Sequence, residues 1–150
     1  MELKNGAIQL TNLSHVGIAV KDADKTLEFL SSIWNIGKPM DVTVYTPSEE
    51  DLMYGEQFTA KLVQVKFGPL NLELLEPIEG NSIWKQFIDE KGEGIHHIAL
   101  GVSNYDEVCQ QFKDGGHELL IEAVFHGERW CYFATAPGGM IIEIREEYNK

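Results

Sequence analysis

Two stretches of the sequence repeat one pattern, and this repeat constrains the fold more than any other feature. LSHVGIAV (13–20) and IHHIALGV (95–102) each contain a histidine followed, two and four positions later, by a small residue. The alignment pairs His15 with His97. Each stretch precedes a polar segment, a helical pattern and several short strand-like runs. The sequence therefore predicts the order strand, helix, strand, strand, strand, occurring twice.

Each half also ends on an apolar strand with a carboxylate near its middle. These strands are LNLELLEP (70–77), which contains Glu73, and GMIIEIRE (139–146), which contains Glu143. The separation from histidine to glutamate is 58 residues in the first half and 46 in the second. An insertion in the acidic segment 46–57 accounts for the difference of 12 residues.

No low-complexity linker separates the halves, so we expect one packed domain over residues 1–150. Its first module spans about 10–78 and its second about 94–147. Between them, residues 81–91 carry isoleucine, tryptophan and phenylalanine at helical spacing, which predicts a short amphipathic linker helix.

The strand face that carries each histidine is otherwise lined by small side chains, because side chains alternate between the two faces of a strand. The small residues are Gly17 and Ala19 beside His15, and Ala99 and Gly101 beside His97. Glycine and alanine contribute little packing to a sheet, so this face suits a cavity with the histidines at its rim. His96 is expected on the opposite face, where it either packs or supports a metal ligand.

A carboxylate within an apolar strand is costly to bury unless it is paired or binds a metal. Taken singly, His15 could be a structural histidine, and Glu73 or Glu143 could lie on a solvated face. The coincidence of a histidine and a glutamate in both halves favours a four-ligand site instead. Its mixed nitrogen and oxygen ligands suit a divalent Zn, Ni, Co, Fe or Mn ion with open positions for water or substrate.

Composition excludes several classes of protein. The net charge of −12 disfavours nucleic acid and anionic membrane surfaces as partners. No apolar run approaches the roughly 18 residues that a membrane helix needs. The first ten residues carry no signal-peptide pattern, and the two cysteines, Cys109 and Cys131, are too few for a disulfide scaffold. We expect reduced cysteines and a cytoplasmic protein.

These motifs resemble the vicinal oxygen chelate superfamily, which includes glyoxalases, methylmalonyl-CoA epimerases, bleomycin-resistance proteins and extradiol dioxygenases. The resemblance covers about residues 12–147. It implies an α+β fold in which two βαβββ modules form curved sheets around a metal-binding cleft. It also implies four metal ligands: His15, Glu73, His97 and Glu143.

Within the superfamily the sequence is most similar to methylmalonyl-CoA epimerases. The similarity lies in NSIWKQFIDEKGEGIHHIALGVSNYDEV (81–108) and in LELLEP (72–77). The turn FATAPGG (133–139) is shorter than the one usual in epimerases. No arginine lies just before His97, where glyoxalase I often binds glutathione.

The resemblance implies an isomerase or epimerase that removes a proton beside a carbonyl. We expect Glu143 to be both metal ligand and base, and Glu73 to be a candidate for the second catalytic acid. The substrate could be an acyl-CoA, a 2-oxo acid or a thiol adduct. The alternatives are a glyoxalase-type lyase and a non-catalytic protein that sequesters a small molecule such as an antibiotic.

Four further residues are candidates for substrate binding: Gln64, Lys66, Arg129 and Trp130. Gln64 and Lys66 lie on the strand before Glu73, and the cations Lys66 and Arg129 could offset the acidic charge near an anionic substrate. Each cation could equally be a surface charge, and Trp130 could simply pack the sheet. Members of the superfamily often form homodimers, so a homodimer is expected, with the site within one chain or between two.

Overall fold

The computed structural model describes residues 1, 6, 8 and 12–147. Residues 10 and 11, the predicted start of the first module, lie outside the described residues, as do most of the first ten residues, for which no signal peptide is predicted. The elements, in chain order, are β1 (Leu13–Ala19), α1 (Ala23–Ile33), β2 (Asp41–Tyr45), β3 (Leu52–Tyr54), β4 (Phe58–Phe67), β5 (Leu70–Gly80), α2 (Ile83–Lys91), β6 (Gly94–Val102), α3 (Tyr105–Asp114), β7 (Glu118–Phe125), β8 (Glu128–Ala134) and β9 (Ile141–Glu146).

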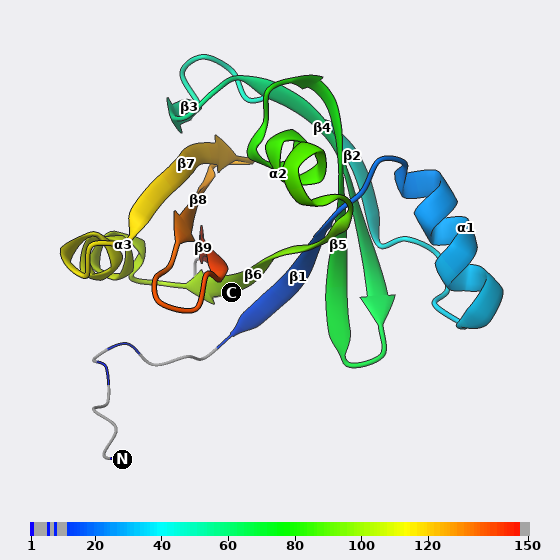
Figure 1. Ribbon diagram of the computed structural model, residues 1–150, viewed down its shortest axis with the longest axis horizontal. Helices are drawn as coiled ribbons and strands as arrows, with labels where there is room; N and C mark the ends of the chain where they lie inside the picture. The colour runs from blue at the N-terminus through cyan, green and yellow to red at the C-terminus, as the bar shows by residue number, and fades with distance from the viewer. Residues whose placement is uncertain (2–5, 7, 9–11, 148–150) are drawn as a thin grey trace.

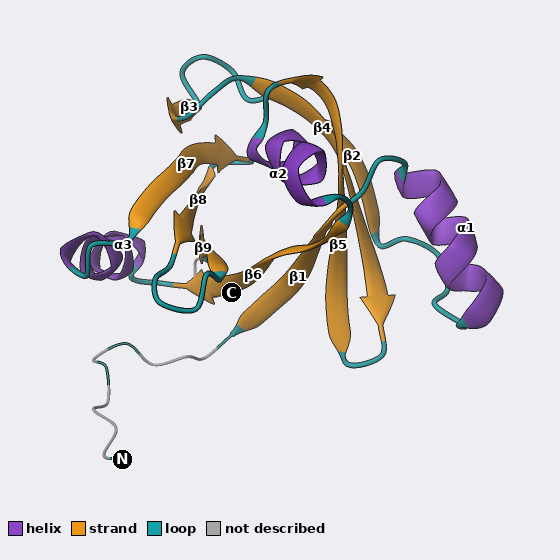
Figure 2. Ribbon diagram, viewed as in Figure 1, coloured by secondary structure: helices purple, strands orange, loops and turns teal. Residues whose placement is uncertain are grey.

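All nine strands form one mixed sheet that curls into a half-barrel (Figures 1 and 2). The strand order is β2-β4-β5-β1-β6-β9-β8-β7-β3. Each half of the chain contributes four strands that are neighbours in the sheet, β2-β4-β5-β1 from the first half and β7-β8-β9-β6 from the second. The halves meet where β1 pairs antiparallel with β6. In each half the first and last strands pair in parallel, β1 with β5 and β6 with β9. The predicted α+β fold of two βαβββ units is therefore confirmed.

Eight of the strands belong to the two repeated units, and the remaining strand, β3, comes from the acidic insertion in the first half. Within residues 46–57 the chain forms the short strand β3, which pairs antiparallel with β7 at the far edge of the second half. The insertion thus links the first half to the edge of the second, which sequence length alone did not indicate.

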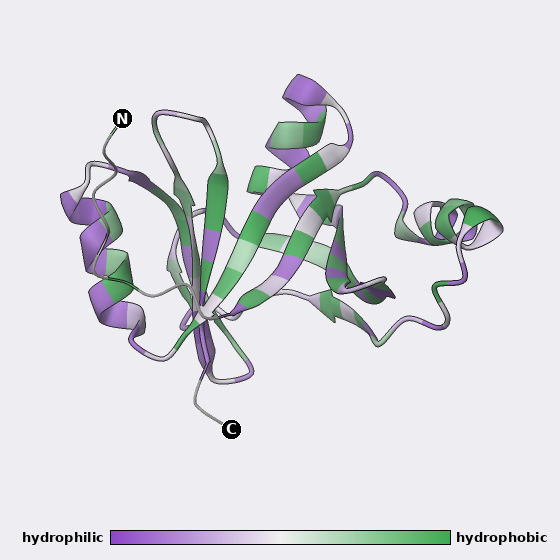
Figure 3. Ribbon diagram, turned by 90° about the horizontal axis from the view of Figure 1, so that it is seen from below, coloured by the Kyte–Doolittle hydropathy of each residue, from purple (hydrophilic) through white to green (hydrophobic). Residues whose placement is uncertain are grey.

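Two helices cover the outside of the sheet. Val16 and Ile18 of β1 pack with Leu27 of α1, and Leu100 and Val102 of β6 pack in the cluster that includes α3. These contacts place α1 and α3 against the strand faces opposite to those that carry His15 and His97. In Figure 3, α3 at the left turns its hydrophobic residues toward the sheet and its polar residues outward.

The third helix, α2, lies over the inner face of the half-barrel (Figure 1). The Ser82 side chain caps its N-terminus by accepting a hydrogen bond from the Lys85 N–H, and Gly92 ends it with a positive φ of 84°. Trp84 of α2 is buried among aromatic side chains, including Phe58, Trp130 and Tyr132. Such aromatic pairs each contribute about 0.5–1.5 kcal/mol beyond their burial, so this cluster fixes α2 to the sheet.

The prediction that His96 lies on the opposite strand face from His97 is wrong. His97 pairs with Gly17 and Ile95 pairs with Ile18, so His96 is an extra residue that forms an irregularity in β6. The irregularity interrupts the alternation of side chains, and His96 lies on the inner side. There its ring contacts Phe87 of α2 and His97.

The two cysteines meet between α3, which contains Cys109, and β8, which contains Cys131. Both are buried and free, with 3.4 Å between the Cys109 and Cys131 sulfur atoms. Within the described part of the chain, no helix is long and apolar enough to cross a membrane.

Candidate metal centre

Four adjacent strands at the centre of the sheet each contribute one side chain to a single cluster. Glu73 comes from β5, His15 from β1, His97 from β6 and Glu143 from β9, in the order in which these strands lie side by side. The register brings them together, because Gly17 pairs with both Glu73 and His97, and Ala99 pairs with both His15 and Glu143.

One ligand atom from each side chain lies within 4.8 Å of those from the others, and all four residues are buried. His15 Nε2 is 3.2 Å from His97 Nε2, 3.1 Å from Glu143 Oε2 and 3.5 Å from Glu73 Oε1. His97 Nε2 is 3.0 Å from Glu143 Oε2. The four side chains therefore point to one common volume.

The donor set fits a divalent metal ion. Glu143 Oε2 is buried and makes no properly oriented hydrogen bond within the described chain, although two imidazole nitrogens lie about 3 Å away. A buried acceptor without a hydrogen bond is costly, and coordination of a cation would satisfy it. Two imidazoles and two carboxylates are common ligands of first-row divalent ions.

The charges of the histidines and glutamates in this cluster stabilise one another. Burial alone lowers the pKa of His15, but Glu73 and Glu143 raise it above its ordinary value. Burial alone raises the pKa of Glu143, but His15 and His97 hold that pKa well below its ordinary value. The site therefore stabilises an ionised Glu143 against a positive charge, which a bound cation would also supply.

Further polar groups hold the ligands in place. The Gln64 amide donates a hydrogen bond to Glu73 Oε2. The Ser14 hydroxyl lies 3.2 Å from His15 Nδ1, and His96 Nδ1 lies 3.1 Å from His97 Nδ1. Partners of this kind fix ring orientation in metal sites.

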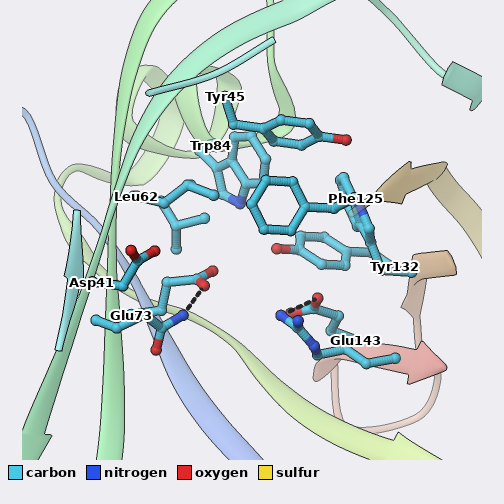
Figure 4. Close-up of a pocket in the computed structure, with 12 residues that line it drawn as sticks. Asp41, Tyr45, Leu62, Glu73, Trp84, Phe125, Tyr132 and Glu143 are labelled. Carbon is cyan, nitrogen blue, oxygen red and sulfur yellow. Dashed lines mark hydrogen bonds and ion pairs between the residues drawn. The ribbon is translucent and has the colours of Figure 1, made fainter. Parts of the chain in front are cut away.

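A cavity of about 180 Å³ opens onto this cluster (Figure 4). Its polar lining comprises Asp41, Gln64, Glu73, Glu143 and Arg145, and its apolar and aromatic lining comprises Tyr45, Leu62, Leu75, Trp84, Phe125, Trp130 and Tyr132. Figure 4 shows Asp41 and Glu73 on one side of the cavity and Glu143 on the other, with the aromatic rings above them. The Tyr132 hydroxyl lies 3.4 Å from His97 Nε2.

Two of the four predicted substrate-binding residues, Gln64 and Trp130, line this cavity. The other two do not. Lys66 is exposed and its amino group lies 3.4 Å from the Asn71 side-chain oxygen. Arg129 lies against α3, where it donates hydrogen bonds to Asp106 and Glu146, because it occupies the strand face opposite to that of Trp130.

Arg145 and Asp41 line the cavity but were not among the predicted residues. Arg145 could have been found, since it lies two residues after Glu143 and alternation places both side chains on one face. Asp41 carries no such signal, because only the pairing of β2 with β4 brings it next to Gln64.

The class of protein is defined by a half-barrel of paired βαβββ units with two histidines and two glutamates at its centre, a cluster that could hold a metal ion. The chain belongs to the glyoxalase/bleomycin resistance protein/dioxygenase superfamily, whose family model matches residues 14–135.

Several relatives in this family are enzymes. The chain is 28% identical over 151 residues to a 2-epi-5-epi-valiolone epimerase from Actinomyces sp., covering 87% of this chain and 76% of the relative. It is 27% identical over 137 residues to a lactoylglutathione lyase from Escherichia coli O157:H7, covering 90% of this chain and 92% of the relative. Among solved structures, a variant of Streptomyces coelicolor methylmalonyl-CoA epimerase in complex with 2-nitronate-propionyl-CoA matches with a TM-score of 0.68 and 25% identity, covering 94% of this chain and 100% of that chain.

Proposed function

We propose that this protein is a divalent-metal-dependent epimerase or isomerase that moves a proton at a carbon next to a carbonyl, in the manner of methylmalonyl-CoA epimerases. One observation carries the proposal. Four buried side chains, His15, Glu73, His97 and Glu143, converge at the wall of a cavity that is open to a small ligand. Epimerases and a glyoxalase-type lyase among the relatives support the same class of chemistry.

The four side chains would hold the metal, whose identity among Co, Ni, Zn, Mn and Fe stays open. A bound divalent ion would polarise the substrate carbonyl and so lower the cost of removing the neighbouring proton. The protein's part is to orient the substrate against the carboxylates, exclude water and transfer the proton.

Glu143 is the proposed base, because its carboxylate reaches the cavity and the metal site at once. An epimerase also needs a second group that returns the proton from the opposite side. Glu73 and Asp41 face Glu143 across the cavity (Figure 4), so carboxylates are available on both sides of a substrate. The Gln64 hydrogen bond holds Glu73 in position for this role.

The cavity limits the substrate. At about 180 Å³ it is smaller than the roughly 300–1,000 Å³ that is typical of sites for larger ligands, so it suits a compact acyl group or 2-oxo acid. The nucleotide part of an acyl-CoA would have to lie outside it. A thiol adduct, handled by a glyoxalase-type lyase, is the second candidate, favoured by the similarity to a lactoylglutathione lyase.

Proton exchange in deuterated water tests the proposal. The protein is stripped of metal, reloaded with cobalt and mixed with methylmalonyl-CoA, and the α-proton is followed by NMR. Cobalt-dependent loss of this signal is expected for the wild type. In Glu143→Gln no exchange should occur, so the signal should persist. Glu79→Gln, an exposed carboxylate on the same strand as Glu73, is the control and should exchange normally.

Other outcomes separate the alternatives. Proton exchange that occurs only with the hemithioacetal of methylglyoxal and glutathione would show that the protein is a glyoxalase-type lyase and not an epimerase. Ligand binding without turnover, unaffected by Glu143→Gln, would indicate a protein that sequesters a small molecule. Full activity in Glu143→Gln would show that Glu143 is not the base.

A further inference from the structure

Arg145 has no role in the chemistry proposed above, yet it lies beside the metal centre. It follows Glu143 by two residues in β9, so both side chains leave the same face of the strand. Its side chain is 26% exposed and lines the cavity. Among the described residues around this cavity, Arg145 is the one cation, while Asp41, Glu73 and Glu143 are carboxylates.

The guanidinium of Arg145 has unused hydrogen-bond donors. Its nearest carboxylate contact within the described chain is the 3.7 Å separation between Nη1 and Glu143 Oε1, which is too long for a hydrogen bond. Arg129, by contrast, donates four side-chain hydrogen bonds of 2.7–3.2 Å to Asp106 and Glu146. A guanidinium carries five N–H donors, so those of Arg145 are available to a molecule in the cavity.

The charges around the cavity explain why such a cation is needed. The carboxylates of Glu73 and Glu143 would balance the two positive charges of a divalent ion, and Asp41 adds a further negative charge. Without Arg145 these groups would leave one net negative charge at the cavity, which would repel an anionic substrate, and Arg145 neutralises that charge. A guanidinium is not deprotonated in proteins, so Arg145 carries its positive charge in the cavity.

We propose that Arg145 binds a carboxylate group of the substrate and selects compact 2-oxo or 3-oxo acids, and half-thioesters of dicarboxylic acids that keep one free carboxylate, over neutral molecules of the same size. This inference rests on the proposed function, since it assigns the substrate of that same site. A guanidinium matches a carboxylate in shape and can donate two parallel hydrogen bonds to it. Arg145 is thus a specificity-determining residue that anchors one end of the substrate while the reacting carbonyl lies at the metal centre.

Calorimetric titration of the cobalt-loaded protein with two probes tests this assignment. Pyruvate carries the carboxylate, and pyruvamide is its neutral analogue of nearly equal size. The wild-type protein is expected to bind pyruvate about tenfold or more tightly than pyruvamide, the effect of a charge-assisted hydrogen-bonded pair. Arg145→Gln should abolish this preference, and Arg145→Lys should retain part of it.

The control is Lys113→Gln, which removes one positive charge from the exposed end of α3 and should leave the preference unchanged. The visible absorption of cobalt shows in each variant that the metal centre is intact. If Arg145→Gln does not fold, Arg145→Lys decides, because lysine keeps the charge but cannot donate two parallel hydrogen bonds to a carboxylate. Equal affinity for the two probes, or no binding of pyruvate, overturns the assignment, and so does tighter binding of inorganic phosphate than of pyruvate.

The same samples separate this inference from the proposed function. Loss of the pyruvate methyl proton signal in deuterated water reports proton transfer, and the titration reports anion selection. A preference for pyruvate, with no proton exchange of either pyruvate or methylmalonyl-CoA, would reject the proposed function and keep the anion site. Exchange without any preference would keep the function and reject the role of Arg145.

Discussion

Gly17 lies directly opposite His97 across the β1–β6 pair, and the imidazole of His97 occupies the space where a side chain of residue 17 would be. A Cβ atom built on Gly17 would overlap the ring carbon and both ring nitrogens of His97. The φ of Gly17 lies outside the left-handed region, so the absence of a side chain matters here, and backbone freedom does not. The position of one histidine of the candidate metal centre therefore depends on a glycine in the other half of the chain.

The substitution Gly17→Ala is expected to displace His97 and weaken metal binding by more than about tenfold, with a loss of about 1–3 kcal/mol in the free energy of unfolding from overpacking. Cobalt titration and urea denaturation measure the two effects. Gly101→Ala is the matched control in the second half. An added Cβ there meets the end of the flexible Glu147 side chain, so metal affinity should be retained. Equal metal affinity in wild type and Gly17→Ala would contradict the proposed position of His97.

Glu73→Gln tests whether all four side chains bind the metal. The amide keeps the shape of the side chain but removes the charge, so we expect cobalt affinity to fall by more than about tenfold. This loss would be at least as large as the one that follows removal of a hydrogen-bond partner of a metal ligand. Glu79→Gln, exposed on the same strand, should bind cobalt as the wild type does. Metal analysis after dialysis provides the measurement. Unchanged stoichiometry and affinity in Glu73→Gln would leave a centre of three ligands.

Arg129→Gln separates a structural arginine from a substrate-binding one. Its guanidinium bonds to the exposed Asp106 and the buried Glu146, so its removal is expected to lower the free energy of unfolding by about 1–3 kcal/mol. Pyruvate affinity should stay within about twofold of the wild type, because Arg129 lies outside the cavity. Lys25→Gln, which breaks an exposed ion pair with Asp22, should change stability by less than about 0.5 kcal/mol. A large loss of pyruvate affinity in Arg129→Gln would restore its predicted role.

Much of this architecture could be predicted from the sequence, because the repeat and the alternation of side chains both act over short distances. They were enough to group His15 and His97 with Glu73 and Glu143. His96 was misplaced because alternation assumes regular pairing, and the irregularity in β6 depends on its partner strand. The pairing of β3 with β7 likewise depends on two segments that are distant in sequence.

The aromatic wall of the cavity was less predictable than the ligands. Trp130 and Tyr132 alternate on β8 as a strand requires, but the sequence does not reveal that Tyr45 and Trp84 meet them from β2 and α2. Those contacts arise only when the sheet curls. The same contacts bury the Tyr45 side chain among aromatic rings, and this burial raises the pKa of its phenol.

Tyr45 predicts how stability changes at alkaline pH. It is buried among aromatic rings, its hydroxyl donates a hydrogen bond to the Val124 carbonyl, and burial raises its pKa to about 12. The folded state therefore binds the phenolic proton more tightly than the unfolded state, whose pKa is about 10. The contribution of the Tyr45 phenol to the free energy of unfolding is complete below pH about 10. It is lost as the pH rises toward 12, and the loss amounts to up to about 3 kcal/mol.

Urea denaturation at pH 9 and at pH 11 checks this expectation against Tyr45→Phe. The variant should lose about 1 kcal/mol at pH 9, because the hydrogen bond to Val124 is removed. It should lose less stability than the wild type between pH 9 and pH 11, because it has no buried phenol to ionise. Tyr54→Phe, at an exposed position on β3, should follow the wild-type profile. Identical pH profiles for wild type and Tyr45→Phe would mean that the phenol of Tyr45 is accessible to water, and that β2 does not close the wall of the cavity.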